Sequence, residues 1–256
     1  MTAHQHGRAQ VAVVSGASSG IGRETARLLT EAGWIVYAVA RRAERLEELA
    51  EQCGAIPHPL DVTDQEGTRR LAQRVLREQG TVDALLNISG AALGVDSVAE
   101  GRFEDWESMF RLNVLGTLNM IQAFLPALRD NGEGTVLNLT STAAEAGYEG
   151  GGGYNAAKFG ERGLTQALRL EEAEHNLRVI EVAPGMVHTE EFSAKRLGGN
   201  LEAAQKVYEG VSKPLTAEDV ARVAAYAVTL PHHINLDLIT MRPVAQAAQH
   251  KVIRRS

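Results

Sequence analysis

Several residue types are scarce in this 256-residue chain, and each shortage excludes a class of protein. The single cysteine, Cys53, rules out an internal disulfide and a zinc site built on several cysteines. Aromatic residues make up only 5% and the net charge is −6, so neither base stacking nor a broad basic surface indicates a nucleic-acid partner. No uninterrupted apolar run reaches about 18 residues, so we expect no membrane span.

Targeting and metal-binding signals are also missing. The first ten residues, MTAHQHGRAQ, hold no apolar segment of the kind that a secretory signal needs, which together with the lone cysteine favours a cytoplasmic location. The eight histidines are scattered and only His232 and His233 are adjacent, so we expect no bound metal. A chain of this length can bury about three quarters of its unfolded surface and needs no metal to fold.

The sequence does have a regular alternation of short apolar runs with longer amphipathic segments. Continuous apolar runs are typical of strands covered on both faces, and apolar residues at i, i+3 and i+4 are typical of helices. The runs predict strands at Gln10–Ser15, Trp34–Ala40, Ala55–Leu60, Val82–Ile88, Gly134–Leu139, Leu177–Val182 and Asn235–Thr240. Helices are expected at Ile21–Ala32, Glu44–Gln52, Asp64–Gln79, Phe103–Leu128, Tyr154–Glu174 and Ala217–Thr229.

Strands joined by helical crossovers form parallel sheets. The pattern therefore predicts a single α/β domain over residues 1–256, a doubly wound Rossmann-type parallel sheet of about seven strands with helices on both faces. The stretch 187–214 is the least regular part of the chain. A structureless connection of about 25 residues in a compact domain is more often functional than accidental, so we expect a substrate lid there.

The first expected strand runs into a glycine-rich segment, SGASSGIG at Ser15–Gly22, and then into a helix. In this position Gly16 permits a tight turn, Gly20 lets the backbone approach a phosphate, and Gly22 lets the helix pack closely. Free N–H groups at the helix start would then hold a pyrophosphate. A plain turn is the alternative, but the strand–turn–helix context favours a dinucleotide site.

The end of the second expected strand indicates which dinucleotide fits. An acidic residue there would accept the 2′-hydroxyl of NAD, but the sequence has Ala40, Arg41 and Arg42. Two guanidinium groups suit the 2′-phosphate of NADP, unless both are solvated surface residues. Asp61, at the end of the third expected strand, could accept a hydrogen bond from the adenine amino group, and a helix cap is its alternative role.

Three residues could form a proton-transfer site. Tyr154 and Lys158 are four apart and share one helix face, while Ser141 lies at the carboxyl end of the fifth expected strand, the edge where ligands bind. A free tyrosine has a pKa near ~10, and work as a base near pH ~8 requires ~2.7 kcal/mol. One positive charge at ~4–5 Å supplies ~3–4 kcal/mol at an effective dielectric of ~20, so we expect Lys158 to suffice.

With these motifs the chain resembles the short-chain dehydrogenase/reductase family along nearly its whole length. The glycine turn and the trio Ser141, Tyr154 and Lys158 match the family's spacing. Further matches are NISG at 87–90, which resembles the family's Asn-Asn-Ala-Gly, Asn113 in RLNVLG, and Pro184-Gly185 followed by Thr189. The family's usual serine before the lysine is Ala157 here.

The resemblance implies an NADP-dependent enzyme that acts on CH–OH groups. Tyr154 would transfer the hydroxyl proton, Ser141 would bind the reacting oxygen, and Lys158 would lower the pKa of Tyr154 and hold the ribose. Asn113 would hold a water that links Lys158 to solvent, or bond backbone in a helix kink, and the two roles are compatible. The implied cofactor residues are Gly16, Ser18, Ser19, Gly20, Ile21, Gly22, Arg41, Arg42, Asp61, Val62, Asn87, Gly90, Tyr154, Lys158, Pro184, Gly185, Val187 and Thr189.

A narrower resemblance is to the NADP-dependent 3-hydroxy acid dehydrogenases, which act on serine, allo-threonine and related acids. It is carried by short segments: ALG at 92–94, EDWE at 104–107, EFSAKR at 191–196, TLPHHIN at 229–235 and RPVAQ at 242–246. It implies a small 3-hydroxy acid or its semialdehyde as substrate, contacted by Ser141, Tyr148, Met186 and Arg196. Tyr148 and Met186 could instead be packed structurally, and Lys195 is the rival of Arg196 as the carboxylate anchor.

Two other functions stay open at this point. One is a carbonyl or keto reductase of neutral substrates, and the other is a non-catalytic NADP-binding redox sensor. The presence of all three of Ser141, Tyr154 and Lys158 argues against the sensor. Relatives in the family assemble as dimers or tetramers, so a homodimer or homotetramer is expected, built on the helices at Phe103–Leu128 and Tyr154–Glu174.

Overall fold

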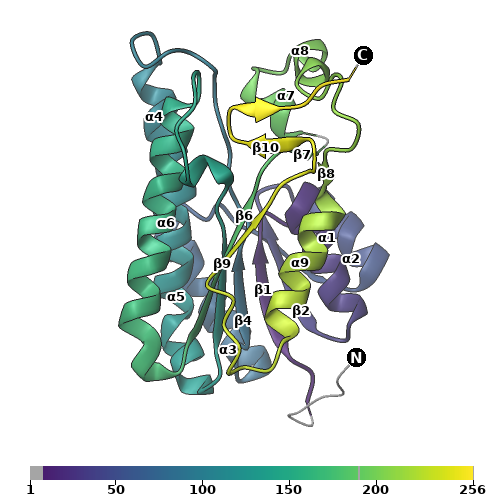
Figure 1. Ribbon diagram of the computed structural model, residues 1–256. Helices are drawn as coiled ribbons and strands as arrows, with labels where there is room; N and C mark the ends of the chain where they lie inside the picture. Colours follow the sequence, from purple (N-terminus) through teal and green to yellow (C-terminus); the bar gives the residue numbers. More distant parts are fainter. Residues whose placement is uncertain (1–7, 190, 256) are drawn as a thin grey trace.

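The computed structural model describes residues 8–189 and 191–255, and a seven-stranded parallel sheet runs through its centre (Figure 1). The strands follow the order β3, β2, β1, β4, β5, β6, β9 across the sheet, and each neighbouring pair is parallel. Their bounds are β1 Val11–Ser15, β2 Ile35–Ala40, β3 Ile56–Pro59, β4 Ala84–Asn87, β5 Thr135–Leu139, β6 Arg178–Pro184 and β9 Leu238–Met241. The predicted Rossmann-type arrangement is therefore present.

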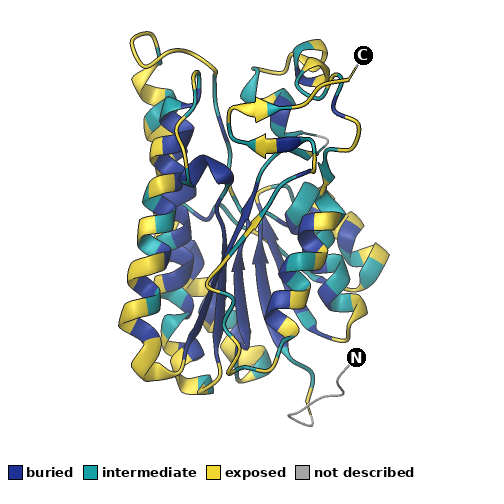
Figure 2. Cartoon of the chain, viewed as in Figure 1, coloured by how far each residue is buried: buried dark blue, intermediate teal, exposed yellow. Residues whose placement is uncertain are grey.

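Helices cover both faces of this sheet. The long ones are α1 Gly20–Glu31, α2 Ala43–Cys53, α3 Gln65–Gln79, α4 Phe103–Phe110, α5 Gly116–Asn131, α6 Gly152–Glu172 and α9 Ala217–Thr229. On β1, Ala12 and Val14 pack in the cluster that contains residues of α1, α2 and α9, while Val11 and Val13 pack with residues of α3, α5 and α6. Because alternate side chains enter opposite cores, the strand is buried along its whole length (Figure 2).

Helix ends follow from local chemistry. Asp64 caps α3, because its carboxylate accepts the backbone N–H groups of Glu66 and Gly67 at 3.1 and 3.0 Å. Gly54 and Gly80 end α2 and α3 in the left-handed conformation, where a side chain would be strained. No helix in the part of the chain that the structure describes is both long and apolar enough to cross a bilayer.

The predicted helical stretch Phe103–Leu128 is interrupted by a π-helical turn, η1 at Arg111–Leu115, between α4 and α5. There the Gly116 N–H donates to the carbonyl of Arg111, five residues earlier rather than four. Such turns are rare in proteins, and many of those that do occur lie at functional sites. This one contains Asn113, so the irregular turn sets the position of a predicted site residue.

The segment at 187–214, where a lid is expected, is more regular than the sequence suggested. Instead of a structureless connection, residues 187–216 contain β7 Val187–His188, α7 Phe192–Arg196, α8 Leu201–Lys206 and β8 Leu215–Thr216. The last sheet strand begins at Leu238 rather than Asn235. An unpredicted hairpin follows it, with β10 at Gln246–Ala248 and β11 at Lys251–Val252. Both segments lie over the carboxyl edge of the sheet, at the top of the view in Figure 1.

The strand order places the ligand-binding edge. After β1 the chain builds β2 and β3 on one side, then crosses back to add β4 on the other side of β1. The connections that leave β1 and β4 therefore diverge, and a crevice opens outside the carboxyl ends of these two strands. The glycine turn follows β1 directly, so the topology brings it to this crevice.

Candidate active site

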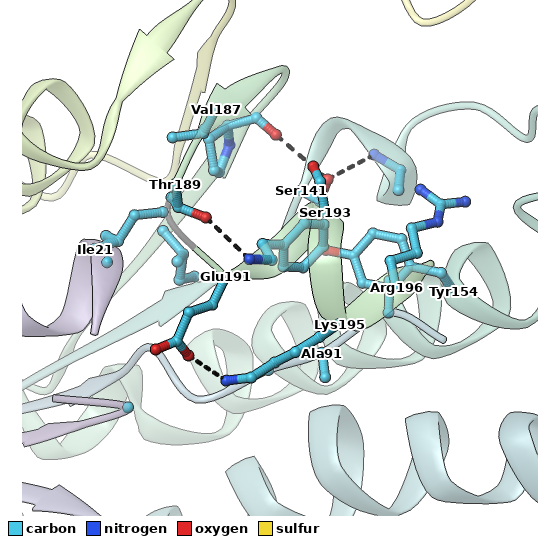
Figure 3. A pocket seen from close by; sticks show the side chains of 18 of the residues that line it. Ile21, Ala91, Ser141, Tyr154, Val187, Thr189, Glu191, Ser193, Lys195 and Arg196 are labelled. Atoms are coloured by element: carbon cyan, nitrogen blue, oxygen red, sulfur yellow. Dashed lines mark hydrogen bonds and ion pairs between the residues drawn. The ribbon is translucent and has the colours of Figure 1, made fainter. Parts of the chain in front are cut away.

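A single cleft of about 690 Å³ gathers nearly all of the predicted site residues. It lies beyond the carboxyl ends of β1, β4, β5 and β6, and the lid forms its other wall (Figure 3). Of the residues named from the sequence, only Asn87 and Asn113 do not line it. A volume of this size is typical of cofactor and substrate sites.

The floor of the cleft at the glycine turn is built by backbone contacts that leave no room for side chains. Gly16 has φ +72°, and a Cβ on it would lie 2.9 Å from the Ser89 nitrogen. A Cβ on Gly22 would lie 2.4 Å from the Gly16 carbonyl oxygen. Since both clashes are with backbone, the start of α1 is open to an approaching phosphate only while these positions are glycine.

The two arginines after β2 lie differently. The Arg42 guanidinium folds over the glycine turn, donating to the hydroxyls of Ser18 and Ser19 at 3.0 Å each and to the carboxylate of Glu191 at 2.7 Å. The Arg41 side chain is 71% exposed at the rim, with Asp61 at 4.0 Å. Both line the cleft, so the end of β2 presents two positive charges beside the turn.

Glu191 connects the lid to this charged corner. Its carboxylate accepts from Arg42 on the cofactor side and from Lys195 at 2.5 Å on its own helix. These donors, Arg42 first, hold the pKa of Glu191 at about 2 although partial burial opposes this. The carboxylate is therefore ionised at neutral pH. Sequence reasoning missed Glu191, because its partner Arg42 is 149 residues away along the chain.

Asp61 does not cap a helix. Its Oδ1 accepts from the backbone N–H and the hydroxyl of Thr63, at 2.9 and 2.8 Å, while Asp64 caps α3. The cap alternative raised by the sequence is therefore wrong. Asp61 and its neighbour Val62 both line the cleft, which leaves Asp61 available for a contact with a bound base.

Ser141, Tyr154 and Lys158 meet at the centre of the cleft. Ser141 ends the segment after β5 and begins the short 3₁₀ helix η2, Thr142–Ala144, where its hydroxyl accepts the Ala143 N–H at 3.1 Å. Tyr154 and Lys158 come from the first two turns of α6, and the Lys158 nitrogen lies 5.9 Å from the centre of the Tyr154 ring. The arrangement puts a hydroxyl, a phenol and an ammonium beside one another.

The Lys158 ammonium is not free to act on Tyr154 alone. It donates to the carbonyl of Leu139 at 2.9 Å and to the carboxylate of Glu161 at 2.6 Å. Burial alone would lower the pKa of Lys158, but Glu161 and then Tyr154 raise it above its ordinary value. Lys158 is therefore a buried cation with an anion next to it.

The pKa of Tyr154 differs in direction from the prediction. Burial of the phenol raises its pKa, and the opposing effects of Lys158 and of the hydrogen bond with Ser141 do not cancel that rise. The argument from the sequence counted the lysine charge but not the desolvation of the buried phenol, which is the largest effect. The expectation that Lys158 suffices to lower the pKa is therefore wrong for this structure.

Asn113 combines a structural and a functional position. Its side-chain nitrogen donates to the carbonyls of Met109 and Ala91 at 2.7 and 2.9 Å, which fixes the π turn. Its Oδ1 is buried without a hydrogen-bond partner among the described residues. A Cβ on Gly90 would lie 2.7 Å from that oxygen and 3.3 Å from the Lys158 nitrogen. The Asn113 oxygen and the Lys158 nitrogen therefore both border the space beside Gly90.

Asn87 is not brought into the cleft. It is the last residue of β4, and its amide donates to Asn138, which in turn donates to Thr165 on α6. The residues of this segment that line the cleft are Ile88, Ser89, Gly90, Ala91 and Ala92. The Ser15 hydroxyl accepts the N–H groups of Ile88 and Ser89, which holds this loop against the glycine turn.

Arg196, on α7, points toward the centre of the cleft (Figure 3). Its guanidinium donates to the Tyr148 hydroxyl and to the carbonyls of Gly150 and Gly94, at 3.0, 3.0 and 3.2 Å. The guanidinium carbon is 6.0 Å from the centre of the Tyr154 ring. The rival anchor Lys195 is more than half exposed and pairs with Glu191 instead.

Residues near the C-terminus complete the wall, and sequence reasoning gave them no role. Gln246, Gln249 and Val252 line the cleft. The Gln246 carboxamide accepts the Met186 N–H at 2.8 Å, and a Cβ on Gly185 would lie 2.2 Å from it. Phe192 also lines the cleft and packs edge-on against Tyr154 at 5.9 Å. Of the C-terminal residues, only Gln246 lies in a segment that the sequence analysis had singled out, RPVAQ at 242–246.

Comparisons with known proteins agree with the geometry. A family model described as short chain dehydrogenase matches residues 10–198. An uncharacterised oxidoreductase of Mycobacterium tuberculosis is 46% identical over 94% of each chain. An NADP-dependent 3-hydroxy acid dehydrogenase of Salmonella typhi is 34% identical over 96% of this chain and 100% of its own. The solved closed form of serine dehydrogenase complexed with NADP⁺ matches with a TM-score of 0.90 and 32% identity, over 96% of this chain and 100% of that one.

The glycine floor gives a test that needs no substrate. Gly22→Ala should weaken NADPH binding by ~10-fold or more, because the added Cβ forces the turn open and misplaces its N–H donors. Affinity can be measured by the fluorescence of the bound nucleotide. Gly163→Ala is the matched control, since Gly163 lies in α6 with nothing within 4 Å of its added Cβ. Equal affinity in the two variants would contradict the role of the turn.

Proposed function

The chain belongs to the short-chain dehydrogenase family, and we propose that it transfers a hydride between NADP(H) and a small 3-hydroxy acid or the matching semialdehyde. It is an oxidoreductase, and the finer assignment rests on one observation above all. The Arg196 guanidinium is held over the substrate side of Tyr154, beside groups such as Ser141 and Met186 that carry no charge. A carboxylate is the substrate group that such a cation recognises.

The cofactor is NADP. The glycine turn offers free N–H groups to the pyrophosphate, and the pair Arg41 and Arg42 offers positive charge where the 2′-phosphate of the ribose would lie. Thr189 lies beside Gly20 across the cleft, with its methyl carbon 3.6 Å from the position of a Cβ there. When bound, the nicotinamide supplies the hydride for reduction or accepts it in oxidation.

The residues of the chain handle the proton. In oxidation, Tyr154 takes the proton of the substrate hydroxyl as the hydride leaves the same carbon, and in reduction it returns a proton to the carbonyl oxygen. Ser141 hydrogen-bonds that oxygen and stabilises the charge that develops on it. Lys158 orients the ribose of the cofactor, and its positive charge acts to lower the pKa of the Tyr154 phenol. The unpartnered Oδ1 of Asn113 would hold a water that passes the proton toward solvent.

The substrate carboxylate would displace part of the existing contacts of Arg196. The guanidinium is held by Tyr148 and two backbone carbonyls, so its plane is already oriented toward Tyr154 before substrate binds. Two parallel bonds from Arg196 would fix the hydroxyl carbon relative to the nicotinamide. The same three acceptors also favour a second candidate, a reductase of neutral carbonyl compounds in which Arg196 only shapes the lid.

We further propose that the chain works as one catalytic domain in the cytoplasm, as a homodimer or homotetramer. Large apolar side chains lie exposed on the outer side of α4 and α6, where Phe103 is 78%, Phe110 44% and Phe159 46% exposed. The two helices pack side by side at the left of Figure 1. A second copy would cover this apolar surface, and sedimentation of the purified protein tests the assembly.

Tyr154→Phe should lower kcat by ~100-fold or more, because a general acid–base group contributes ~10²–10⁴-fold. NADPH affinity should stay within a few-fold, since the glycine turn and Lys158 hold the nucleotide. Tyr208→Phe is the control, as Tyr208 also lines the cleft but bonds Ser193 and Val187 in the lid. If Tyr154→Phe kept more than about a tenth of kcat, the proton-transfer role would be excluded.

The protein should prefer NADP(H) over NAD(H) by roughly 10- to 150-fold in kcat/KM, the value of one or more charge-assisted hydrogen bonds. Replacing Ala40 with Asp and Arg41 with Ser should reverse the preference, by adding an acceptor for the ribose and repelling the phosphate. Arg45→Ser is a suitable control, because Arg45 pairs with Glu48 on α2 outside the cleft. Equal use of both cofactors by the unmodified protein would refute the assignment.

Arg196→Ala should lower kcat/KM for a 3-hydroxy acid by ~30-fold, or ~2 kcal/mol, and change little for an uncharged alcohol of similar size. Lys195→Ala, one residue away and facing Glu191, should leave both unchanged. The measurement compares the two substrates in each variant. Equal losses for both would assign Arg196 to the shape of the lid, and turnover of neutral ketones alone would favour the second candidate.

A further inference from the structure

Glu161 is a completely buried carboxylate directly behind the catalytic lysine. It lies one helical turn after Lys158 on α6, and its relative exposure is 0%. One oxygen accepts the Lys158 ammonium at 2.6 Å and the other accepts the Thr117 hydroxyl of α5 at 3.1 Å. No step described so far uses this residue.

The fold alone does not account for a charge at this position. Removing a carboxylate from water is costly, and well-packed apolar residues often stabilise a core as well as a buried ion pair does. The buried side of α6 also carries Glu172, but that carboxylate pairs with Arg129 at the other end of the helix, whereas Glu161 lies beside Lys158. What distinguishes position 161 is its contact with Lys158, so the carboxylate is best explained by what it does to that lysine.

Two cations lie near Tyr154: Lys158 pairs with a buried carboxylate, whereas Arg196, 6.0 Å from the ring centre on the cleft side, donates to the Tyr148 hydroxyl and to two carbonyls. Glu181, on β6, is also buried, but its carboxylate accepts from Arg162 at 2.8 Å and from Thr140 at 2.5 Å. Arg162 thus balances Glu181, and Glu145 lies a further 3.8 Å from the Arg162 guanidinium. From α5, the Thr117 hydroxyl donates to Glu161 and carries no charge. Glu161 is accordingly the counter-ion of Lys158, with the Tyr154 phenol on the cleft side of the lysine.

Resting on the proposed function, we propose that Glu161 is a positioning residue that balances the charge of Lys158 and so keeps the Tyr154 phenol protonated, ready to donate its proton during carbonyl reduction. An unpaired ammonium beside Tyr154 would stabilise the phenolate. The carboxylate behind the ammonium offsets that attraction. It also fixes the ammonium between Leu139 and Glu161, within reach of the cleft.

The pKa shifts of the three groups are consistent with this arrangement. Glu161 acts to raise the pKa of Tyr154 and to raise the pKa of Lys158. Burial raises the pKa of Glu161 itself, while its two donors, Lys158 and Thr117, favour its ionised form. In reduction, the hydride forms the new C–H bond, the phenol proton forms the new O–H bond, and the phenolate then regains a proton from solvent.

Glu161→Gln tests the proposal, because glutamine keeps the shape and an oxygen acceptor for Lys158 but removes the charge. The ultraviolet absorbance of tyrosinate is titrated in the protein and in its Tyr154→Phe form, and the difference isolates Tyr154. The same pair is measured in the Glu161→Gln background. We expect the Tyr154 titration to move to lower pH by about one unit or more. This readout needs no substrate, so it stands or fails separately from the substrate assignment.

The pH profile of turnover gives the second readout. If the substrate class is right, the acidic limb of kcat for alcohol oxidation should move to lower pH by a similar amount, since oxidation needs the phenolate. Glu161→Asp, which retains the charge, should keep a profile near that of the unmodified protein. Should Glu161→Gln fold poorly, Glu161→Met, of similar volume, is expected to show the same shift.

Glu172→Gln is the matched control on the same helix. Glu172 is buried and pairs with Arg129 at 2.5 Å, remote from the cleft. It should lose thermal stability without any change in the Tyr154 titration. The proposal is overturned if Glu161→Gln behaves in the same way, losing stability only, or if its Tyr154 titration moves to higher pH.

Discussion

The close contact between two loops, one after β1 and one after β4, is the constraint on which the rest of the site depends. The Ser15 hydroxyl accepts two N–H groups of the β4 loop, and Gly16 packs against the same loop with no space for a side chain. This contact fixes the direction in which α1 leaves the sheet. It also places Gly90, and through it the neighbourhood of Asn113 and Lys158. The parallel sheet places both loops at the same edge, and this contact fixes their orientation relative to one another.

The parts of the structure that depend on local pattern could be predicted from the sequence. The strand β1 and the helix α9 follow from apolar periodicity, and the observed bounds of α9 coincide with the predicted ones. The glycine turn leaves no space for a Cβ at Gly16 or Gly22, as expected of a phosphate-binding turn between a strand and a helix. Ser141, Tyr154 and Lys158 meet because the ends of parallel strands and the helix that follows them share one edge of the sheet.

What could not be predicted depends on contacts between distant residues. The lid helix α7 is only five residues long and is held by Arg196 on Gly94 and Tyr148, which no local pattern reveals. The π turn at Asn113 needs the carbonyl of Ala91 as a partner. The pKa of Tyr154 was predicted in the wrong direction because the desolvation of the phenol is a property of the packed core. The balance of charges in a core depends on tertiary contacts.

One short segment of the lid, residues 191–196, is bonded to both sides of the cleft. Glu191 is bonded to Arg42 at the nucleotide side, and Arg196, five residues later, is bonded to Tyr148 at the substrate side. The short helix α7 lies between these attachments and joins the two sides of the cleft. A displacement of one attachment is therefore passed on to the other, so the nucleotide side and the substrate side of the cleft share one wall and are mechanically coupled through it.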